Sequence, residues 1–89
     1  MPDPVAWLVV EAGWEVVSSD GEKVGAIDEV LGDQNADIFD GLAVDHGLLK
    51  KAKYVPSERV GEIVEGRVAL TMTPAEFDAL DDYEPKLPG

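Results

Sequence analysis

The chain has 89 residues, which suits one domain with a single hydrophobic core. Its 19 acidic residues against 7 lysines and arginines give a net charge of -12, which disfavours binding to nucleic-acid phosphate or anionic lipid. The sequence holds no cysteine, so disulfides, thiolate metal sites and cysteine nucleophiles are excluded. Its start matches neither a signal peptide nor a membrane span, and we expect a soluble cytoplasmic protein.

Residues 1–12 form an apolar leader ahead of the first clear strand. Its apolar run, 5–10, is too short for periodicity to distinguish a buried strand from a helical turn. We expect Trp7 and Leu8 to pack on the body of the domain and Trp14 to pack in the core or at its end. An exposed aromatic side chain used for binding is the alternative.

Residues 14–30 contain the clearest β-hairpin signal in the sequence. Asp20-Gly21 between two strand-like runs favours a two-residue type I′ turn, in which both residues have positive φ. That turn pairs Val17 with Val24 on the core side of the sheet. Beyond the turn the apolar positions are spaced by three, which indicates a bulge or kink near Gly25. The prediction is a strongly bent sheet that coils toward a small barrel.

The third predicted strand covers residues 37–45. Alternate residues of a strand lie on the same face, and one face of this strand contains Ile38, Asp40, Leu42 and Val44. Since Asp40 interrupts that apolar phase, the strand either frays at its start or bulges around Gly41, and both alternatives stay open. Pro56 cannot donate to a strand ladder, so the fourth strand, 54–56, is short or lies at an edge.

A second hairpin is predicted for residues 60–64 and 67–72, which flank Glu65-Gly66. A turn at these two residues places Ile63 opposite Val68. The residues expected to face the core are Gly61, Ile63, Val68, Leu70 and Met72.

A short α-helix is predicted over residues 73–82. Thr73 is the expected N-cap, and Glu76 three residues later completes a capping box. Phe77 and Leu80 share one face of this helix, which we expect to cover an open end of the barrel.

Asp33, Asn35 and Asp37 are the candidate metal ligands, because they match the first three oxygen positions of a calcium-binding loop. The match ends there, since Ile38 stands where the loop needs glycine and Val44 where it needs a chelating glutamate. A solvated turn is therefore favoured over a calcium site.

A basic cluster falls within ten positions of this acidic chain and consists of Lys50, Lys51, Lys53 and Arg59. The cluster either docks the acidic face of a second copy or another protein, or keeps an edge strand soluble. His46, the single histidine, is predicted to be a surface residue in a turn, with a pH-sensitive contact as the alternative.

Four stretches share a pattern of turn glycines, a proline and apolar strand positions: 16–27, 42–44, 54–60 and 64–70. This pattern resembles the PRC-barrel domain, which takes its name from the cytoplasmic domain of the photosynthetic reaction-centre H subunit. The resemblance covers residues 13–72 and implies a small, antiparallel all-β barrel of about six strands, with no enzyme activity and no single ligand. The family also includes the C-terminal half of a ribosome maturation factor.

The sequence therefore predicts one PRC-barrel-like domain over residues 1–89, with the barrel at 13–72 and a loose tail at 83–89. We expect a non-enzymatic protein-interaction or self-association module without a cofactor, which forms a homodimer and binds neither nucleic acid nor membrane. The predicted contact residues are Trp7, Leu8, Lys50, Lys51, Lys53 and Arg59. The alternatives are an adaptor linked to ribosome maturation and a sensor that binds a small ligand or cation through its acidic loops.

Overall fold

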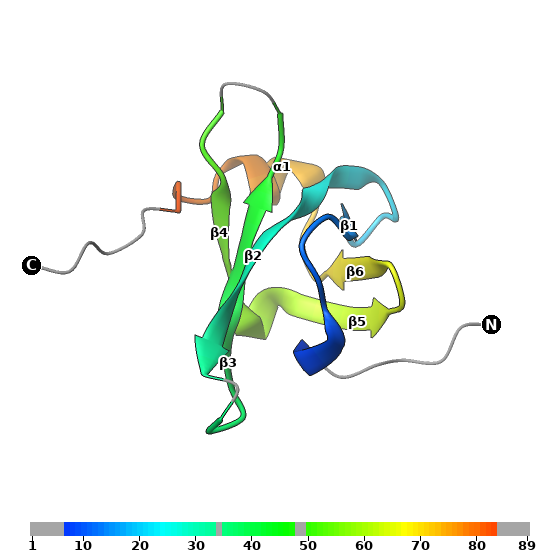
Figure 1. Cartoon of the computed structure of the whole chain (residues 1–89). Coiled ribbons are helices and arrows are strands. Elements are labelled where there is room, and N and C mark those ends of the chain that lie inside the picture. Colours follow the sequence, from blue (N-terminus) through cyan, green and yellow to red (C-terminus); the bar gives the residue numbers. More distant parts are fainter. Residues whose placement is uncertain (1–6, 34, 48–49, 84–89) are drawn as a thin grey trace, which may run out of the picture.

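The computed structural model describes residues 7–33, 35–47 and 50–83, and Figure 1 shows a β-rich domain with one short helix near the C-terminal end. The strands are β1 (Glu15–Val17), β2 (Lys23–Asp33), β3 (Ile38–Asp45), β4 (Lys53–Pro56), β5 (Val60–Val64) and β6 (Arg67–Leu70). The helical elements are the 3-10 turns η1 (Trp7–Val9) and η2 (Ser57–Arg59) and the α-helix α1 (Pro74–Asp78). The first six residues of the predicted leader and the predicted tail beyond residue 83 lie outside the described part of the chain.

The six strands form one sheet in the order β4-β3-β2-β1-β6-β5. The sheet is mixed, because β1 runs parallel to β6, with Val16 beside Val68. Its two edge strands, β4 and β5, do not pair with each other, so the sheet is not closed. The predicted antiparallel barrel was therefore wrong, although the mostly β fold with a short C-terminal helix is confirmed. Hairpin turns dictate antiparallel pairing only between neighbouring strands, whereas β1 and β6 are far apart in sequence and no turn fixes their relative direction.

The hydrophobic core lies on one face of this bent sheet. Its buried members are Val10, Val16, Ile27, Leu42, Val44, Val55, Val68, Leu70, Met72 and Phe77. They come from the leader, all the strands except β5, the segment between β6 and α1, and α1 itself, so one core holds these elements together.

The first hairpin has a three-residue loop instead of the predicted type I′ turn. Gly21 has φ 83°, but Asp37 is the only described non-glycine residue with positive φ, so Asp20 is not in the left-handed region. Ser18 N–H donates to Glu22 O at 2.8 Å, and the Ser18 hydroxyl accepts from the N–H of Glu22 at 3.3 Å. Ser18 is 2% exposed, and its buried hydroxyl favours the longer loop by accepting from the backbone N–H groups of Asp20 and Glu22. The pairing register of β1 and β2 is therefore shifted by one residue from the predicted register.

As a result, Val17 lies opposite Lys23 and not opposite Val24 as predicted. Val24 is the extra residue of a β-bulge, since Val16 pairs with Gly25. The predicted irregularity near Gly25 is thus confirmed. A side chain at Gly25 would collide with the backbone carbonyl of Asp45, which explains why this position has none.

A further bulge decides the alternative left open for the third strand. Leu31 pairs with Gly41 and Gly32 pairs with Phe39, so Asp40 is the extra residue and the strand bulges there. Because a bulge reverses the phase of the side chains before it, Phe39 packs against the core. Ile38, predicted to face inward, is 58% exposed.

The second hairpin has the predicted register, with Ile63 opposite Val68 and Val64 opposite Arg67. β5 carries a bulge between Val60 and Ile63, and Val60 packs against the core in the place expected for Gly61. The predicted inward position of Gly61 was therefore wrong for the same reason as that of Ile38.

The helix α1 begins as predicted, at a complete capping box formed by Thr73 and Glu76. It is only five residues long, shorter than the predicted range of 73–82. Phe77 is 1% exposed and belongs to the core, so the helix fills one side of the open sheet and does not cap a barrel. None of the helical elements in the described residues is long and apolar enough to cross a membrane.

The edge of β4 is covered by the chain segment that follows α1. Lys53 and Asp82 form an isolated antiparallel bridge. Tyr54 N–H donates to Asp81 O at 3.1 Å, and Tyr83 N–H donates to Ala52 O at 2.7 Å. The predicted edge position of β4 is confirmed, and this edge has its own backbone partner.

Candidate interaction surfaces

The first candidate surface is apolar and combines η1 with the start of β3. The rings of Trp7 and Phe39 are stacked, with centroids 5.1 Å apart and an interplanar angle of 15°. Trp7 Nε1–H also donates to Asp37 Oδ1 at 3.1 Å. These two contacts, made across 30 or more residues of chain, hold the leader against the β2–β3 hairpin.

The geometry of η1 explains which of its side chains remain exposed. A 3-10 turn has three residues per turn, so Trp7 and Val10 lie on the same side of η1. Val10 is in the core, and its N–H donates to Trp7 O at 3.1 Å. Leu8 and Val9 are left on the outer side, 44% and 51% exposed. Leu8 therefore does not pack on the domain as predicted, whereas Trp7 does.

Leu8, Val9 and Ile38 are the large hydrophobic side chains with the greatest exposure in the described residues. They belong to the two segments that the Trp7–Phe39 stack joins. We call this region the η1–β3 surface and define it as Trp7, Leu8, Val9, Ile38 and Phe39.

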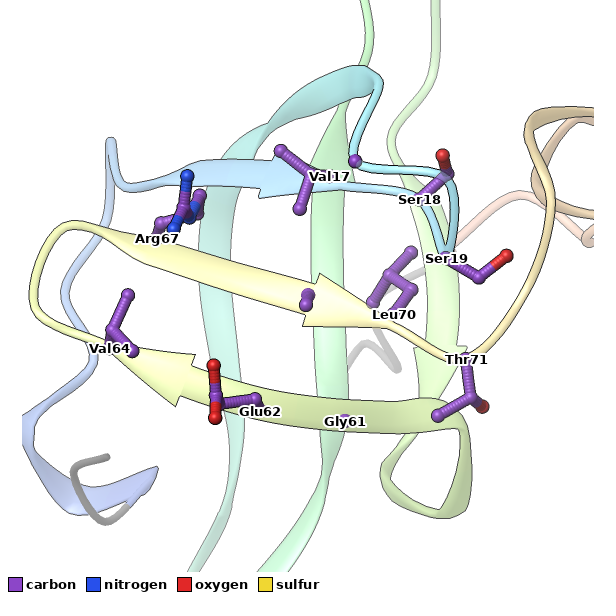
Figure 2. Close-up of a pocket in the computed structure, with 11 residues that line it drawn as sticks. Val17, Ser18, Ser19, Gly61, Glu62, Val64, Arg67, Leu70 and Thr71 are labelled. Atoms are coloured by element: carbon purple, nitrogen blue, oxygen red, sulfur yellow. The ribbon is translucent and has the colours of Figure 1, made fainter. Parts of the chain in front are cut away.

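The second candidate surface is a groove of about 580 Å³ on the face of β1, β6 and β5 that is turned away from the core (Figure 2). Val17 lies beside Ala69 in register, and Val64 lies opposite Arg67. Val17 and Val64 are 7% and 5% exposed without belonging to the core cluster. The groove is hollow because its lining includes Ala69 and Gly61, which have little or no side chain.

The two ends of the groove differ chemically. Figure 2 shows Arg67 and Val64 at one end and the hydroxyl side chains of Ser19 and Thr71 at the other. Arg67 is exposed and makes no side-chain hydrogen bond or ion pair with any other described residue. Glu62, on β5, also lines the groove. The groove thus offers an apolar floor with one available guanidinium at its end.

The predicted basic cluster does not act as one free surface. Lys53 Nζ donates to Leu80 O at 2.8 Å and lies 3.7 Å from an Asp82 carboxylate oxygen. Arg59 lies 3.4 Å from Glu76 at the start of α1. Two of its four cations therefore attach the helix and the chain beyond it to the sheet, while Lys50 is exposed.

His46 has a packing role that its sequence position does not reveal. The ring is half-buried and lies edge-on to Phe77, with centroids 5.7 Å apart. Its Nε2 is 2.9 Å from Lys51 O. His46 therefore keeps one side exposed in the loop after β3, and its ring contact with Phe77 comes from a helix that is distant in sequence.

Two of the candidate metal ligands Asp33, Asn35 and Asp37, namely Asp33 and Asp37, have carboxylates that accept hydrogen bonds within the chain. Asp33 Oδ1 accepts the N–H of Asn35 at 2.9 Å and the N–H of Ala36 at 3.3 Å, which is an Asx turn. Asp37 accepts from Trp7 and has φ 53°. Within the described residues, no three histidine or acidic side chains gather in an arrangement that could hold a metal ion. A cation-sensing role for these loops stays a prediction.

Two tyrosines that the sequence did not single out lie among acidic side chains. The Tyr54 hydroxyl is 3.4 Å from Asp40 Oδ2. Partial burial raises the pKa of Tyr54, and the negative charge and hydrogen bond of Asp40 raise it further. Partial burial also raises the pKa of Tyr83, together with the charge and hydrogen bond of Glu29. Both phenols therefore stay protonated and act as hydrogen-bond donors to carboxylates.

A family model described as an uncharacterized protein conserved in bacteria (DUF2171) matches residues 10–77. It is not a PRC-barrel family, so the PRC-barrel resemblance was wrong. The positions that suggested it are turn glycines, a proline and apolar strand residues, which any small, strongly bent sheet requires. The hypothesis of a ribosome-maturation adaptor rested on that resemblance and therefore loses its support. No curated protein matches the chain.

Proposed function

The chain belongs to the DUF2171 family, and from this premise we propose that it is a non-enzymatic interaction module that forms a homodimer through the η1–β3 surface. The observation that carries the proposal is the exposure of Leu8, Val9 and Ile38, at 44%, 51% and 58%. An 89-residue domain has little core to spare, and a second copy can supply the apolar contact that these side chains lack among the described residues. We further propose that the protein is cytoplasmic.

The energetics favour a modest affinity. Burial of a Leu, Val or Ile side chain contributes about 1.5–3 kcal/mol, and a two-fold symmetric interface buries each of them twice. This gain is offset by about 4–15 kcal/mol for lost translational and rotational freedom. The net charge of -12 on each copy opposes association further. Because these side chains are already about half buried in the monomer, the gain is about half of the full value and nearly cancels the cost. We therefore expect a weak dimer, with a dissociation constant of roughly 100 μM.

Two further observations support a role in recognition. His46 is engaged by Phe77 and by a backbone carbonyl, a packing role that does not require acid–base chemistry. Lys53 and Arg59 pair with Asp82 and Glu76, which leaves fewer of the seven cations to contact nucleic-acid phosphates.

Sedimentation equilibrium of the full chain tests the proposal. Leu8→Asp places a charge on the η1–β3 surface and should yield a monomer, while Ala75→Asp adds the same charge at an exposed position of α1 and should leave the dimer intact. The matched charge separates a local effect from long-range repulsion. A wild-type chain that stays monomeric at high micromolar concentration and high salt would overturn the proposal, as would a Leu8→Asp variant that dimerises normally.

A further inference from the structure

The edge strand β4 offers a single backbone donor to an added strand. Tyr54 N–H points away from β3, because it donates to Asp81 O at 3.1 Å. Every second residue of a strand turns its backbone groups to the same side, so Pro56 is the next outward residue of β4. Since proline has no N–H, the outward donor of β4 is that of Tyr54.

Residues 81–83 occupy this edge, and we call them the strap (Figure 1). Asp81 O accepts the N–H of Tyr54, and Tyr83 N–H donates to Ala52 O at 2.7 Å. The strap thus uses the outward donor of β4 and the carbonyl two residues before it. The β4 edge therefore binds a short strand, which in this structure belongs to the same chain.

Two side chains of the strap fix its register on the sheet. Lys53 and Asp82 form an antiparallel bridge, and Lys53 Nζ lies 3.7 Å from Asp82 Oδ1. The Tyr83 hydroxyl donates to the carboxylate of Glu29, on β2. An acid followed by a phenol is therefore the pair of side chains that this edge binds.

The strap is attached less firmly than the helix before it. Phe77 of α1 is 1% exposed and belongs to the core, whereas no residue of the strap does. Asp81 and Asp82 are exposed, and Tyr83 is half-buried. Segments with few buried apolar contacts and exposed backbone hydrogen bonds open locally without unfolding of the whole domain. Opening of the strap alone would uncover the edge of β4.

The strap also lies beside acidic side chains of the sheet. Partial burial raises the pKa of Tyr83, and the negative charges of Glu29, Asp28 and Asp40 raise it further, so these carboxylates face the strap. The carboxylate of Asp81 makes no hydrogen bond or ion pair with another described residue. A segment with a neutral residue in the place of Asp81 keeps every contact of the strap and brings less negative charge to this face.

We propose that the β4 edge binds an extended segment of another protein, which displaces the strap and carries a neutral β-branched residue, an aspartate and a tyrosine in succession. The aspartate faces Lys53 and the tyrosine hydroxyl donates to Glu29, as Asp82 and Tyr83 do in the strap. The strap is then a built-in competitor, because it must open before the partner binds. The apparent affinity is lowered by the fraction of molecules in which the strap is open.

A second copy of the chain is a poorer occupant than this segment. Its strap carries the same extra carboxylate, at Asp81, and has no advantage over the strap already in place. Its β4 has one outward donor, at Tyr54, so two such edges form a minimal ladder. The site also lies apart from the proposed dimer, since neither β4 nor the strap belongs to the η1–β3 surface. The Leu8→Asp variant should therefore bind the segment as the wild type does.

Amide hydrogen exchange of the full chain, followed by NMR, tests the opening of the strap. Tyr83→Pro removes both the N–H that donates to Ala52 and the phenol that donates to Glu29. We expect the Tyr54 amide to exchange about ten-fold faster in this variant than in the wild type, which corresponds to one lost hydrogen bond. Tyr83→Phe keeps the N–H and should accelerate this exchange less. The amide of Val16, in the interior of the sheet, should exchange at the same rate in all three proteins.

NMR titration with capped hexapeptides tests the binding site. The probe is Leu-Val-Asp-Tyr-Thr-Pro, which is the sequence of residues 80–85 with neutral residues in place of the acids on either side of Asp-Tyr. We expect it to shift the resonances of β4 and to bind Tyr83→Pro about ten-fold more tightly than the wild type, because the competing strap is weakened. An analogue that is N-methylated on tyrosine should bind about ten-fold more weakly, since it lacks the donor to Ala52. An analogue with asparagine for aspartate should lose up to about five-fold, the effect of one exposed ion pair.

Variants at two lysines identify the partner of the aspartate. Lys53→Gln should remove the preference for aspartate over asparagine in the probe. Lys50→Gln is the matched loss of a cation at an exposed position and should retain that preference. Thermal melting verifies that each variant is folded.

Several results would overturn the proposal. The first is equal exchange of the Tyr54 amide in Tyr83→Pro and the wild type, and the second is no binding of the probe to Tyr83→Pro at millimolar concentration. Equal affinity of the probe for the two proteins would show that it does not compete with the strap. Self-association of Tyr83→Pro through β4, with the probe unbound, would show that a second copy is the occupant instead.

Discussion

Lys53 in β4 donates a hydrogen bond from Nζ to the carbonyl of Leu80 at 2.8 Å, immediately beyond the end of α1. The same ammonium donates to Asp78 O at 3.2 Å, and the side chain is only 14% exposed. The last turn of α1 contains no basic residue of its own. Lys53 therefore supplies from the sheet the positive charge that stabilises the carboxyl end of a helix.

Substitution of Lys53 is expected to loosen the helix. Lys53→Met keeps the apolar stem and removes the ammonium, which should lower the free energy of unfolding by about 1.5–3 kcal/mol, as expected for lost hydrogen bonds to a charged group. Urea denaturation measures the change. Lys50→Met, at an exposed neighbouring position, should stay within about 0.5 kcal/mol of the wild type. Equal losses in the two variants would show that Lys53 is an ordinary surface lysine.

The loop of the first hairpin predicts that substitutions at two adjacent residues, Asp20 and Gly21, differ in their cost to stability. Gly21 has φ 83°, so Gly21→Val should lower the free energy of unfolding by about 1–2 kcal/mol, the cost of a left-handed conformation for a residue with a side chain. Asp20 has no positive φ, and Asp20→Val should cost less. A type I′ turn would make both substitutions costly, so thermal melts of the pair distinguish the two turns.

The parts of the fold that could be predicted are those fixed by local chemistry. The capping box of Thr73 and Glu76 and the turn at Glu65-Gly66 depend on residues within a few positions of each other. The first loop was mispredicted because the buried hydroxyl of Ser18 outweighs the preference of Asp-Gly for a two-residue turn. Each β-bulge shifted by one residue the set of side chains that faces the core. A single sequence does not show where a strand contains such an extra residue.

The candidate site was harder to predict, because it depends on long-range pairing. Val64 and Arg67 face each other in the predicted second hairpin, but Val17 joins them only because β1 pairs with β6 in parallel, and no turn signal indicates that pair. Trp7 was singled out correctly as a packing residue, but its partner Phe39 had no signal, since the bulge at Asp40 turns it toward the core. Lys53 and Arg59 were interpreted as part of a basic cluster that binds a partner protein. They instead contact Leu80 and Glu76, which are distant from them in sequence.

Glu76 should make the stability of the protein depend on acid pH. The backbone N–H of Thr73 donates to this carboxylate at 2.9 Å, which lowers the Glu76 pKa below its ordinary value of 4.5, and the Thr73 hydroxyl lowers it further. A lowered pKa in the folded state means that the stabilisation is present above pH 4.5 and is lost as the pH falls through the folded-state pKa.

Glu76→Gln should therefore melt at a lower temperature than the wild type at neutral pH, and the two curves should converge below pH 4.5. Glu65→Gln removes the same charge from an exposed turn and serves as the control. A constant difference between Glu76→Gln and the wild type across this range would contradict the prediction.

Tyr54 should show the opposite dependence at alkaline pH. Its pKa is raised above 10.0 by partial burial and then by Asp40, so its contribution to stability is complete below pH 10.0 and is lost as the pH rises through the folded-state pKa. In a Tyr83→Phe background, absorbance of the phenolate reports Tyr54 alone. Asp40→Asn should lower that pKa, whereas Asp20→Asn should not. Unchanged titration in Asp40→Asn would remove Asp40 as a cause.

Salt should strengthen self-association through the η1–β3 surface. Two copies of net charge -12 repel each other at long range, and this repulsion is screened within about 8 Å at physiological ionic strength and about 3 Å at 1 M. Contacts of Leu8, Val9 and Ile38 are apolar and do not weaken when salt is added. The dissociation constant measured by sedimentation should thus fall as sodium chloride rises. An interface built instead on the basic cluster and acidic groups would give the reverse trend, because salt screens attraction between opposite charges. The sign of the salt dependence therefore decides which of the two surfaces joins the copies.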